Sequence, residues 1–406
     1  MSSPISTGAE LPTMPHPRAA GCPLLPPSEF AEWRNTGGLR RAMNLFLGQP
    51  AWVLSRYEDI RAALTDPRLS AKTIPEAMIA TGKADDQAVL FPRTDDPEHN
   101  RLRRMLTRDF TVRRAKEMAP DIQRLVDGLV DNIIAAGPPC DFVRDFALPV
   151  PSLVICLLLG VPYEDHDRFQ EHSTGALDTT TTEEQKVASI MAMFSYIYEL
   201  LERKKVEPGN DLLSRLMNDN VANDEMNVAT AAMTGFIMLQ AGHETTASMI
   251  ALGTMLLLDH PDVMTRLRES DDPALHLKTV DELLRYLTIV HSGLVDRVAT
   301  EDMEIHGQLV RTGEHVMMNL VAGNFDSAFV DNPNIFDIER NARGHLAFGY
   351  GVHQCIGQNL ARLELQIALT TVARRLPNLQ LAVPVEELRF MNDQAIYRME
   401  EMPLTW

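Results

Sequence analysis

The sequence has few cysteines and too few basic residues to balance its acidic ones. Its four cysteines (Cys22, Cys140, Cys156 and Cys355) are far apart in a chain of 406 residues. They therefore do not indicate a disulfide framework, and they favour a reducing cytoplasm. No C-x-x-C pair or H-x-x-x-H cluster completes a tetrahedral zinc site. The formal net charge of −18 argues against a nucleic-acid-binding protein and against adhesion to an acidic membrane.

The sequence also lacks a signal for export or membrane anchoring. It has no basic start followed by an apolar stretch, and the apolar run 146–161 contains two prolines and is too short to span a bilayer. Prolines at positions 4, 12, 15, 17, 23, 26 and 27 indicate an extended arm over residues 1–28 that lies on the surface. We therefore expect a cytoplasmic protein without a membrane anchor.

Neither an internal repeat nor a Gly/Ser-rich linker divides the chain, so we expect a single domain over residues 1–406. Apolar residues recur with helical spacing over 101–117, 121–136, 183–205 and 228–258. Short β-like segments occur at 51–54, 297–305, 315–320, 379–383 and in the C-terminal tail. The predicted fold class is mainly α with a minor β region.

Glycines at positions 349, 351 and 357 surround Cys355, and a helix-forming run follows at 358–369. Glycines let the backbone approach a flat cofactor closely, and the N–H groups of a helix N-terminus favour a thiolate. A thiolate in this setting suits a haem iron as its axial ligand. Two alternatives remain open: a small buried hydrophobic residue, or a nucleophile with His353 as its base.

A polar segment, residues 240–246, interrupts the long apolar helix expected at 228–258. Burying such groups without partners costs roughly a few kcal/mol each, and a glycine in a helix costs about 1 kcal/mol. Violations of this kind tend to mark functional sites. Ile237, Ala241 and Thr245 share one helix face, and a hydroxyl beside a carboxylate, Glu244, can transfer protons.

The segment around Cys355 resembles the cysteine-ligand loop of the cytochrome P-450 superfamily. The bacterial pattern F-G-x-G-x-H-x-C-x-G is matched by Phe348, Gly349, Gly351, His353, Cys355 and Gly357. The resemblance implies a triangular α-rich prism in which haem b (iron protoporphyrin IX) lies between a long distal helix and the cysteine loop. It implies Cys355 as the axial iron ligand, with Phe348, Gly349 and Gly357 bordering the cofactor.

The long helix resembles the oxygen-binding motif of the same family, [AG]-G-x-[DE]-T-[TS], through Ala241, Gly242, Glu244, Thr245 and Thr246. The resemblance implies that the two small residues let the helix pass close over the haem. It assigns Thr245 to opening the helical hydrogen-bond ladder and holding dioxygen or a water molecule. It assigns Glu244 to passing protons inward. His243 points elsewhere by spacing, so we expect a structural or solvent-channel role for it.

The same resemblance implies two further groups of residues. Four cationic or imidazole side chains are expected at the haem propionates: His99, Arg103, Arg297 and His353. Glu282, Arg285 and Arg340 are expected to form a structural ion-pair network before the cysteine loop. One departure is Phe325, which stands where the family often has arginine, and we expect a local change in packing there.

The basic run 101–116 contains seven basic residues and one acid, Asp109, in an otherwise acidic protein. It is either a solvated helix face or a docking patch for an acidic electron donor. The chain has no Gly-rich flavin or NAD fingerprint, so electrons must come from outside, and a ferredoxin fits. The expected substrate pocket includes Ile237, Gln240, Ala241, Gly293, Leu294 and Ile396, with the stretches 73–90, 173–183 and 289–295 as further walls. Gln240 either hydrogen-bonds the substrate or is satisfied by backbone.

The resemblance implies a soluble monomeric monooxygenase of the actinobacterial type. It would hydroxylate or epoxidise an apolar small molecule, a secondary metabolite or xenobiotic, with O₂ and electrons from a ferredoxin and its reductase. Alternatives are a nitric oxide reductase, a peroxygenase and, from another class, a haem-based sensor. The Glu244–Thr245 pair argues against all three, because none of them needs the same proton delivery.

Overall fold

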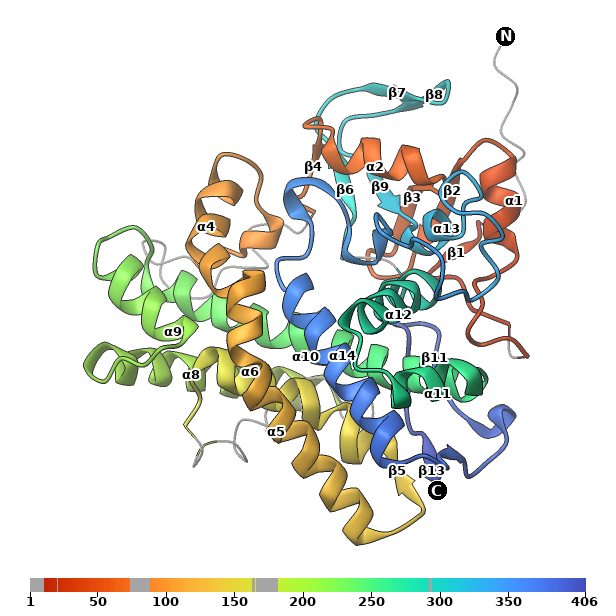
Figure 1. Ribbon diagram of the computed structural model, residues 1–406. Coiled ribbons are helices and arrows are strands. Elements are labelled where there is room, and N and C mark those ends of the chain that lie inside the picture. The colour runs from red at the N-terminus through yellow and green to blue at the C-terminus, as the bar shows by residue number, and fades with distance from the viewer. Residues whose placement is uncertain (1–10, 20, 74–87, 163–164, 166–181, 292–293) are drawn as a thin grey trace.

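The structure is a computed structural model that describes residues 11–19, 21–73, 88–162, 165, 182–291 and 294–406. These residues are mostly helical with a minor β region, as predicted (Figure 1). The helices are α1 (Glu29–Asn35), α2 (Tyr57–Thr65), α4 (Glu98–Thr107), α5 (Val112–Ala136), α6 (Pro149–Leu159), α8 (Glu183–Val206), α9 (Leu212–Arg215), α10 (Val228–Leu258), α11 (Pro261–Glu269), α12 (Pro273–Leu287), α13 (Leu320–Asn324) and α14 (Gln358–Arg375).

Short helical turns and strands complete the described part of the chain. The turns are η1 (Phe91–Arg93), η2 (Arg108–Phe110), η3 (Val143–Ala147), η5 (Leu216–Val221), η6 (Leu346–Phe348), η7 (Gly351–His353) and η8 (Val385–Glu387). The strands are β1 (Thr13–Met14), β2 (Leu39–Asn44), β3 (Gln49–Leu54), β4 (Leu69–Ser70), β5 (Cys140–Asp141), β6 (Arg297–Ala299), β7 (Met303–Ile305), β8 (Gln308–Val310), β9 (His315–Met318), β10 (Gln380–Leu381), β11 (Phe390–Met391), β12 (Arg398–Met399) and β13 (Pro403–Thr405).

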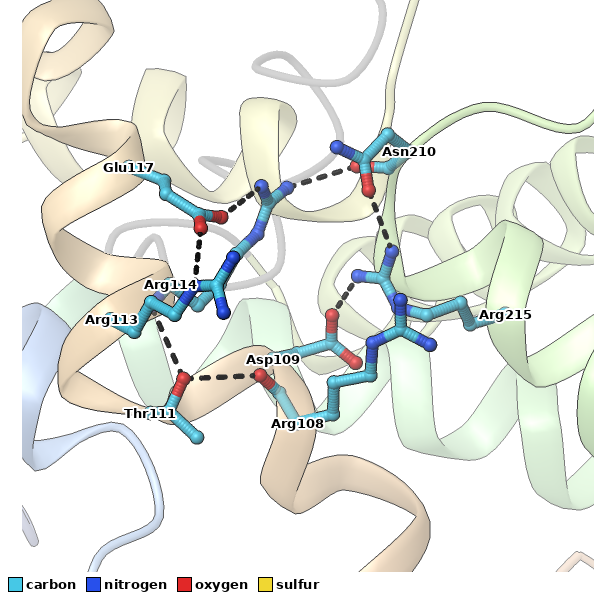
Figure 2. A pocket seen from close by; sticks show the side chains of 8 residues that line it. All are labelled: Arg108, Asp109, Thr111, Arg113, Arg114, Glu117, Asn210 and Arg215. Carbon is cyan, nitrogen blue, oxygen red and sulfur yellow. Dashed lines mark hydrogen bonds and ion pairs between the residues drawn. The ribbon is translucent and has the colours of Figure 1, made fainter.

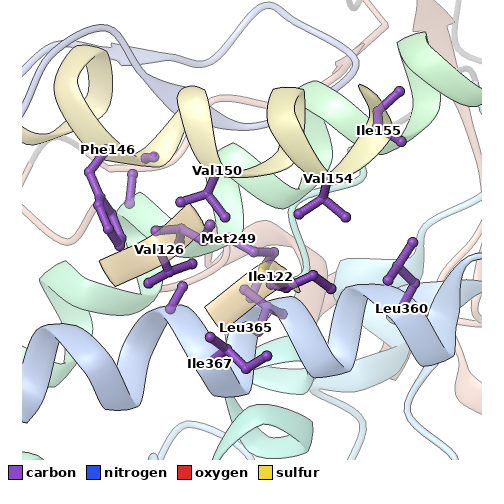
Figure 3. Packing of buried hydrophobic residues seen from close by; sticks show 14 of the residues in the cluster. Ile122, Val126, Phe146, Val150, Val154, Ile155, Met249, Leu360, Leu365 and Ile367 are labelled. Carbon is purple, nitrogen blue, oxygen red and sulfur yellow. The ribbon is translucent and has the colours of Figure 1, made fainter. Parts of the chain in front are cut away.

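The helical core forms around α10, which has the bounds that its apolar pattern predicts. Asn227 caps it by accepting a hydrogen bond from the Thr230 N–H, which satisfies one of the free donors at a helix start. The helix packs against α6, α8 and α14. Figure 3 shows the contact region, where side chains of α5, α6, α10 and α14 interdigitate. Burial on nearly every side explains why α10 is apolar all round.

The largest sheet has six strands in the order β1-β2-β3-β9-β6-β4 and lies to one side of the helices (Figure 1). β2 and β3 form an antiparallel hairpin, and β9 pairs parallel with β3 and antiparallel with β6. β1 comes from the expected N-terminal arm and pairs with β2, and Met14 within it is buried. Among the described residues, no helix combines the length and apolarity that a bilayer crossing requires.

The prediction of one helix over 101–117 is wrong, because two helices, α4 and α5, meet there. α4 ends at Thr107, and Thr111 adopts an extended backbone and caps α5 by accepting from the Arg114 N–H. Asp109, between the two helices, is buried against Arg215 of α9. The boundary between α4 and α5 is therefore set by the Thr111 cap and by the ion pair of Asp109 with Arg215. Pro120 ends no helix, because α5 continues through it.

A buried ion-pair network joins α12 to the segment that precedes the cysteine loop. The guanidinium of Arg285 lies 2.7 Å from the Glu282 carboxylate, and both side chains are 0% exposed. Arg340 lies 3.2 Å from the same carboxylate. The Phe325 ring packs 5.2 Å from the Arg285 guanidinium and 5.5 Å from the ring of Tyr286. An aromatic face therefore covers the network at the position where the family often has arginine.

Glu282→Ala leaves the Arg285 cation buried without its partner. We expect the free energy of unfolding to fall by about 3–5 kcal/mol, measured as a lower urea midpoint. Glu339→Ala is a matched control, because Glu339 pairs with Arg266 at 2.6 Å on the surface and such pairs contribute little. Equal midpoints for the two variants would show that the buried network is not needed for stability.

Candidate active site

The loop that carries Cys355 is folded tightly by its glycines. Gly349 and Gly351 have φ of +68° and +75°, values that glycine adopts without strain. A Cβ at Gly351 would lie 3.1 Å from the Leu64 carbonyl oxygen of α2, so the glycine also permits close packing. The Cys355 N–H donates to the Phe348 carbonyl at 2.9 Å. The loop thus presents the Cys355 side chain just before α14 begins.

Opposing effects act on the pKa of the Cys355 thiol. Its side chain is accessible, but dense protein surrounds it, and this burial raises the pKa of the Cys355 thiol. The N–H groups of Gly357 and Gln358 and the cations Arg103 and Arg362 lower that pKa without outweighing burial. The N–H groups at the helix N-terminus therefore lower the pKa of the thiol, but by less than burial raises it. A metal ligand must be deprotonated, so a haem iron bound at Cys355 would itself favour the thiolate.

Four of the expected cofactor contacts gather beside the cysteine loop. The rings of His99 and His353 lie 3.8 Å apart between centroids, and Arg103 donates to the Gln354 carbonyl at 2.6 Å. Arg297 is buried and donates to the carbonyls of Val295 and Asp296. Burial, with Arg103 and other nearby cations, lowers the pKa of His99, and the pKa of His353 falls to about 3.

This cluster fits an anionic cofactor edge. His99 is fully buried, and neither of its ring nitrogens has a hydrogen-bond partner among the described residues. Burial and the neighbouring Arg93 lower the pKa of Arg297 to about 10, which reflects a crowded positive region. Unpaired buried polar atoms are costly. Two carboxylates such as the haem propionates would satisfy these groups.

The polar segment of α10 is held by bonds within the helix. The Thr245 hydroxyl donates to the Ala241 carbonyl at 2.7 Å, and the Ser248 hydroxyl donates to the Glu244 carbonyl at 2.7 Å. Such bonds compete with the helical ladder. Ala241 is exposed in the middle of this otherwise largely buried helix. His243 contacts the Leu148 carbonyl at 3.1 Å, and burial lowers its pKa to about 4.

The two small residues of the motif have different surroundings. A Cβ on Gly242 would lie 2.6 Å from Cδ1 of Ile155 in α6. Gly242 is therefore small because two helices approach closely there. Ala241, by contrast, presents an open surface. The close contact with α6 gives Gly242 a packing role of its own, and the expectation that both residues let α10 pass over the haem stays a prediction.

Glu244 has a partner that the sequence patterns do not reveal. Nε of Arg398, in β12, lies 2.9 Å from a Glu244 carboxylate oxygen. Burial raises the pKa of Glu244, and Arg398 lowers it. No local spacing signals this contact, because the two residues come from distant parts of the chain. A second unforeseen residue is Arg18 of the arm, which is buried and donates to the Leu287 carbonyl at 2.7 Å.

Comparison with known proteins decides the family. A model of the cytochrome P450 family matches residues 41–392. The chain is a cytochrome P450. Cytochrome P450-SU2 of Streptomyces griseolus is 46% identical over 398 residues, 97% of each chain. The vitamin D3 dihydroxylase of the same species is 42% identical over 394 residues, 96% of each chain. The crystal structure of GfsF aligns with a TM-score of 0.89 at 42% identity, covering 97% of this chain and 100% of that one.

Membership of this family confirms several predictions. The fold is the cytochrome P450 fold, the cofactor is haem b, and the protein is an oxygen-incorporating oxidoreductase. As a cytochrome P450 it requires molecular oxygen and an electron-transfer partner. A sensor without enzyme activity is thereby set aside.

The residues predicted to line the substrate pocket of this cytochrome P450 differ in how far their side chains are exposed. Ile237 and Gln240 are partly exposed on α10, and Leu294 is 48% exposed. Ile396 is 6% exposed and forms an isolated β-bridge with Val290. Gly293, and most of the stretches 73–90 and 173–183, lie outside the described residues.

The predicted basic patch is divided by the fold. Figure 2 shows a surface pocket lined by Arg108, Asp109, Thr111, Arg113, Arg114, Glu117, Asn210 and Arg215. Within it Arg113 and Arg114 pair with Glu117, and Arg114 donates to the Asn210 carbonyl at 2.9 Å. Arg104, Arg108 and Lys116 remain exposed. The pocket contains none of the residues expected to hold haem.

Proposed function

We propose that this cytochrome P450 is a cytoplasmic monomer that hydroxylates or epoxidises an apolar small molecule, a secondary metabolite or xenobiotic, with electrons from a ferredoxin. The observation that most supports this proposal is the open surface at Ala241, with Thr245 and Glu244 beside it in α10. The four cysteines are free thiols, which agrees with a reducing compartment. A relative named for the hydroxylation of vitamin D3 supports a substrate of low polarity.

Each proposed residue has a defined task. Cys355 binds the iron, Phe348, Gly349 and Gly357 border the ring, and His99, Arg103, Arg297 and His353 hold the propionates. The haem supplies oxygen activation, so that one substrate C–H bond, O₂, two electrons and two protons give an alcohol and water. Glu244 and Thr245 deliver the two protons, since a carboxylate and a hydroxyl on one helix can exchange them with solvent.

The substrate pocket follows from the same arrangement. Ile237, Ala241, Leu294 and Ile396 offer apolar surface, and Gly293 belongs to the same stretch as Leu294. Apolar walls with few polar groups are typical of small-molecule sites. We propose that Gln240, which is partly exposed on α10, hydrogen-bonds a polar group of the substrate at the pocket edge. The substrate is therefore inferred to be largely apolar with at least one polar group.

Cys355→His should abolish the thiolate signature of the iron. We expect the reduced, CO-bound protein to lose the red-shifted Soret band, because a neutral imidazole donates less electron density than a thiolate. Cys22→Ser changes an exposed thiol and should leave the band unchanged. A red-shifted band retained by folded Cys355→His protein would assign the ligand to another residue.

Glu244→Gln and Thr245→Ala should divert electrons from product to hydrogen peroxide. Loss of a general acid typically costs about 100-fold or more, so the ratio of product to peroxide should fall steeply with substrate saturating. Ser248→Ala is the matched control, since its hydroxyl also bonds a carbonyl of α10 but is buried. Unchanged ratios in both variants would refute the proton relay. Faster turnover with NO and NADH than with O₂ and ferredoxin would indicate nitric oxide reduction instead.

Electron transfer should depend on the exposed cations of α4. Arg103 contacts the cysteine loop through Gln354, so Arg104 on the same helix is close to the shortest path to the iron. Arg104→Ala should slow reduction by ferredoxin several-fold, and added salt should slow the parent enzyme similarly, because screening weakens charge steering. Arg389→Ala is the control, because the Arg389 side chain is 77% exposed and lies in a distant part of the sequence. This variant should be reduced at the same rate as the parent enzyme. A reduction rate that is insensitive to salt would contradict this docking site.

A further inference from the structure

The C-terminal tail approaches the proton-relay segment through β12. Arg398 lies 2.9 Å from the Glu244 carboxylate, and their side chains are 19% and 24% exposed respectively. Arg398 Nε makes no bond with hydrogen-bond geometry among the described residues. The contact is therefore an ion pair in a partly dry environment, close enough for a strong charge interaction but not locked by directional bonds.

The backbone that carries Arg398 is fixed from both sides. β12 pairs with β11, where Arg398 is opposite Met391. Just before it, the Tyr397 N–H donates to the Ile289 carbonyl at 2.7 Å, and Ile396 bridges Val290. Because side chains alternate along an extended strand, Ile396 and Arg398 face one side and Tyr397 the other. The tail therefore cannot shift without disturbing the segment 289–291.

Tyr397 is held on the opposite side by the N-terminal arm. The guanidinium of Arg18 lies over its ring at 4.2 Å, and the ring of His291 stacks on it at 5.0 Å. Arg18 also donates to the Leu287 carbonyl at the end of α12. Arm, helix end and tail thus form one packed unit. This unit places the Arg398 side chain at α10.

The two members of the proposed relay have different partners. The Thr245 hydroxyl donates to the Ala241 carbonyl, while the Glu244 carboxylate pairs with Arg398. His243, the neighbouring titratable group on α10, contacts the Leu148 carbonyl of another segment. Arg398 is the charged group that acts on Glu244. The pair with Arg398 therefore competes with transfer of a proton from Glu244 to Thr245.

We propose that Arg398 is a positioning residue for proton delivery, which holds the Glu244 carboxylate at the tail and releases it when that group carries a proton toward Thr245. The inference rests on the proposed role of Glu244. Protonation neutralises Glu244 and removes the attraction to Arg398, so the acid is freed at the moment when it has a proton to give. Return of the negative charge restores the pair.

Infrared titration of the carboxyl groups in the substrate-free holoenzyme tests the pair directly. The Glu244 band is identified by its absence from Glu244→Gln. An opposite charge at this range lowers a carboxyl pKa by about 1–3 units, so Arg398→Gln should raise the pKa of Glu244 by about one unit or more. Arg398→Lys should restore most of the shift, and Arg389→Gln, on the same tail, should leave it unchanged. An unaltered titration in Arg398→Gln overturns the proposal.

The pH profile of product formation separates positioning from a merely structural role. Removing Arg398 keeps Glu244 protonated to higher pH, so the limb of the kcat profile that belongs to Glu244 should move to higher pH. The KM for substrate should change less than about two-fold, as expected when ground-state binding is untouched. Arg398→Lys covers the case in which Arg398→Gln binds no haem. An infrared shift without movement of the profile also overturns the proposal.

These results are distinguishable from failure of the proposed function. If Glu244→Gln keeps the parent ratio of product to peroxide, the relay is refuted, whatever the infrared titration of Arg398→Gln shows. If Glu244→Gln loses that ratio but Arg398→Gln titrates like the parent enzyme, the relay stands and the role of Arg398 is refuted.

Discussion

The buried pair of Glu282 and Arg285 positions both the cysteine loop and one wall of the pocket. Arg285 donates to the Asn324 carbonyl at 3.1 Å, and the Asn324 side chain accepts from the Leu346 N–H at 2.6 Å, at the start of the loop. The same side chain donates to Thr288 at 2.8 Å, where α12 ends. The ion pair is therefore linked to the start of the cysteine loop on one side and to the end of α12, before the segment 289–291, on the other. Its many hydrogen bonds offset the cost of burying two charges.

The two sides of α10 have different surroundings near the polar segment, and the apolar sequence of the helix does not reveal this difference. On one side Gly242 admits Ile155, so that α6 and α10 pack closely. On the other, Ala241 is exposed and Thr245 is partly exposed, and the Thr245 hydroxyl donates to the Ala241 carbonyl. Tight packing behind the polar segment holds it in place. A rigid back and an accessible front are what a site for oxygen chemistry needs.

Local sequence signals predicted the elements that local physics controls. The bounds of α10 follow from its apolar composition and the Asn227 cap, whereas the contact of Glu282 with Arg285 was predicted from the family resemblance. The boundary at Thr111 was missed because a buried ion pair between α9 and η2 decides it. At Cys355 the helix N-terminus acts as the sequence predicts, and the folded chain adds burial, which acts on the thiol in the opposite direction.

The partners of Arg18 and Arg398 were beyond prediction for a different reason. Each arginine lies in a terminal segment without helical periodicity, and its contacts are made with residues far along the chain. An arginine in such a segment looks like a solvated surface charge. Only the folded chain shows that one is buried beneath Tyr397 and that the other meets the relay carboxylate.

Two of the glutamates that pair with arginine, Glu282 and Glu244, are held to different degrees. Glu282 is 0% exposed and accepts from Arg285, Arg340 and the Asp337 N–H. Releasing it would leave several buried groups without partners, so it serves only as a scaffold. Glu244 is 24% exposed and has one ionic partner without hydrogen-bond geometry. With one partner and no directional bond to it, Glu244 is held less firmly than Glu282, which agrees with the role in proton transfer proposed for it.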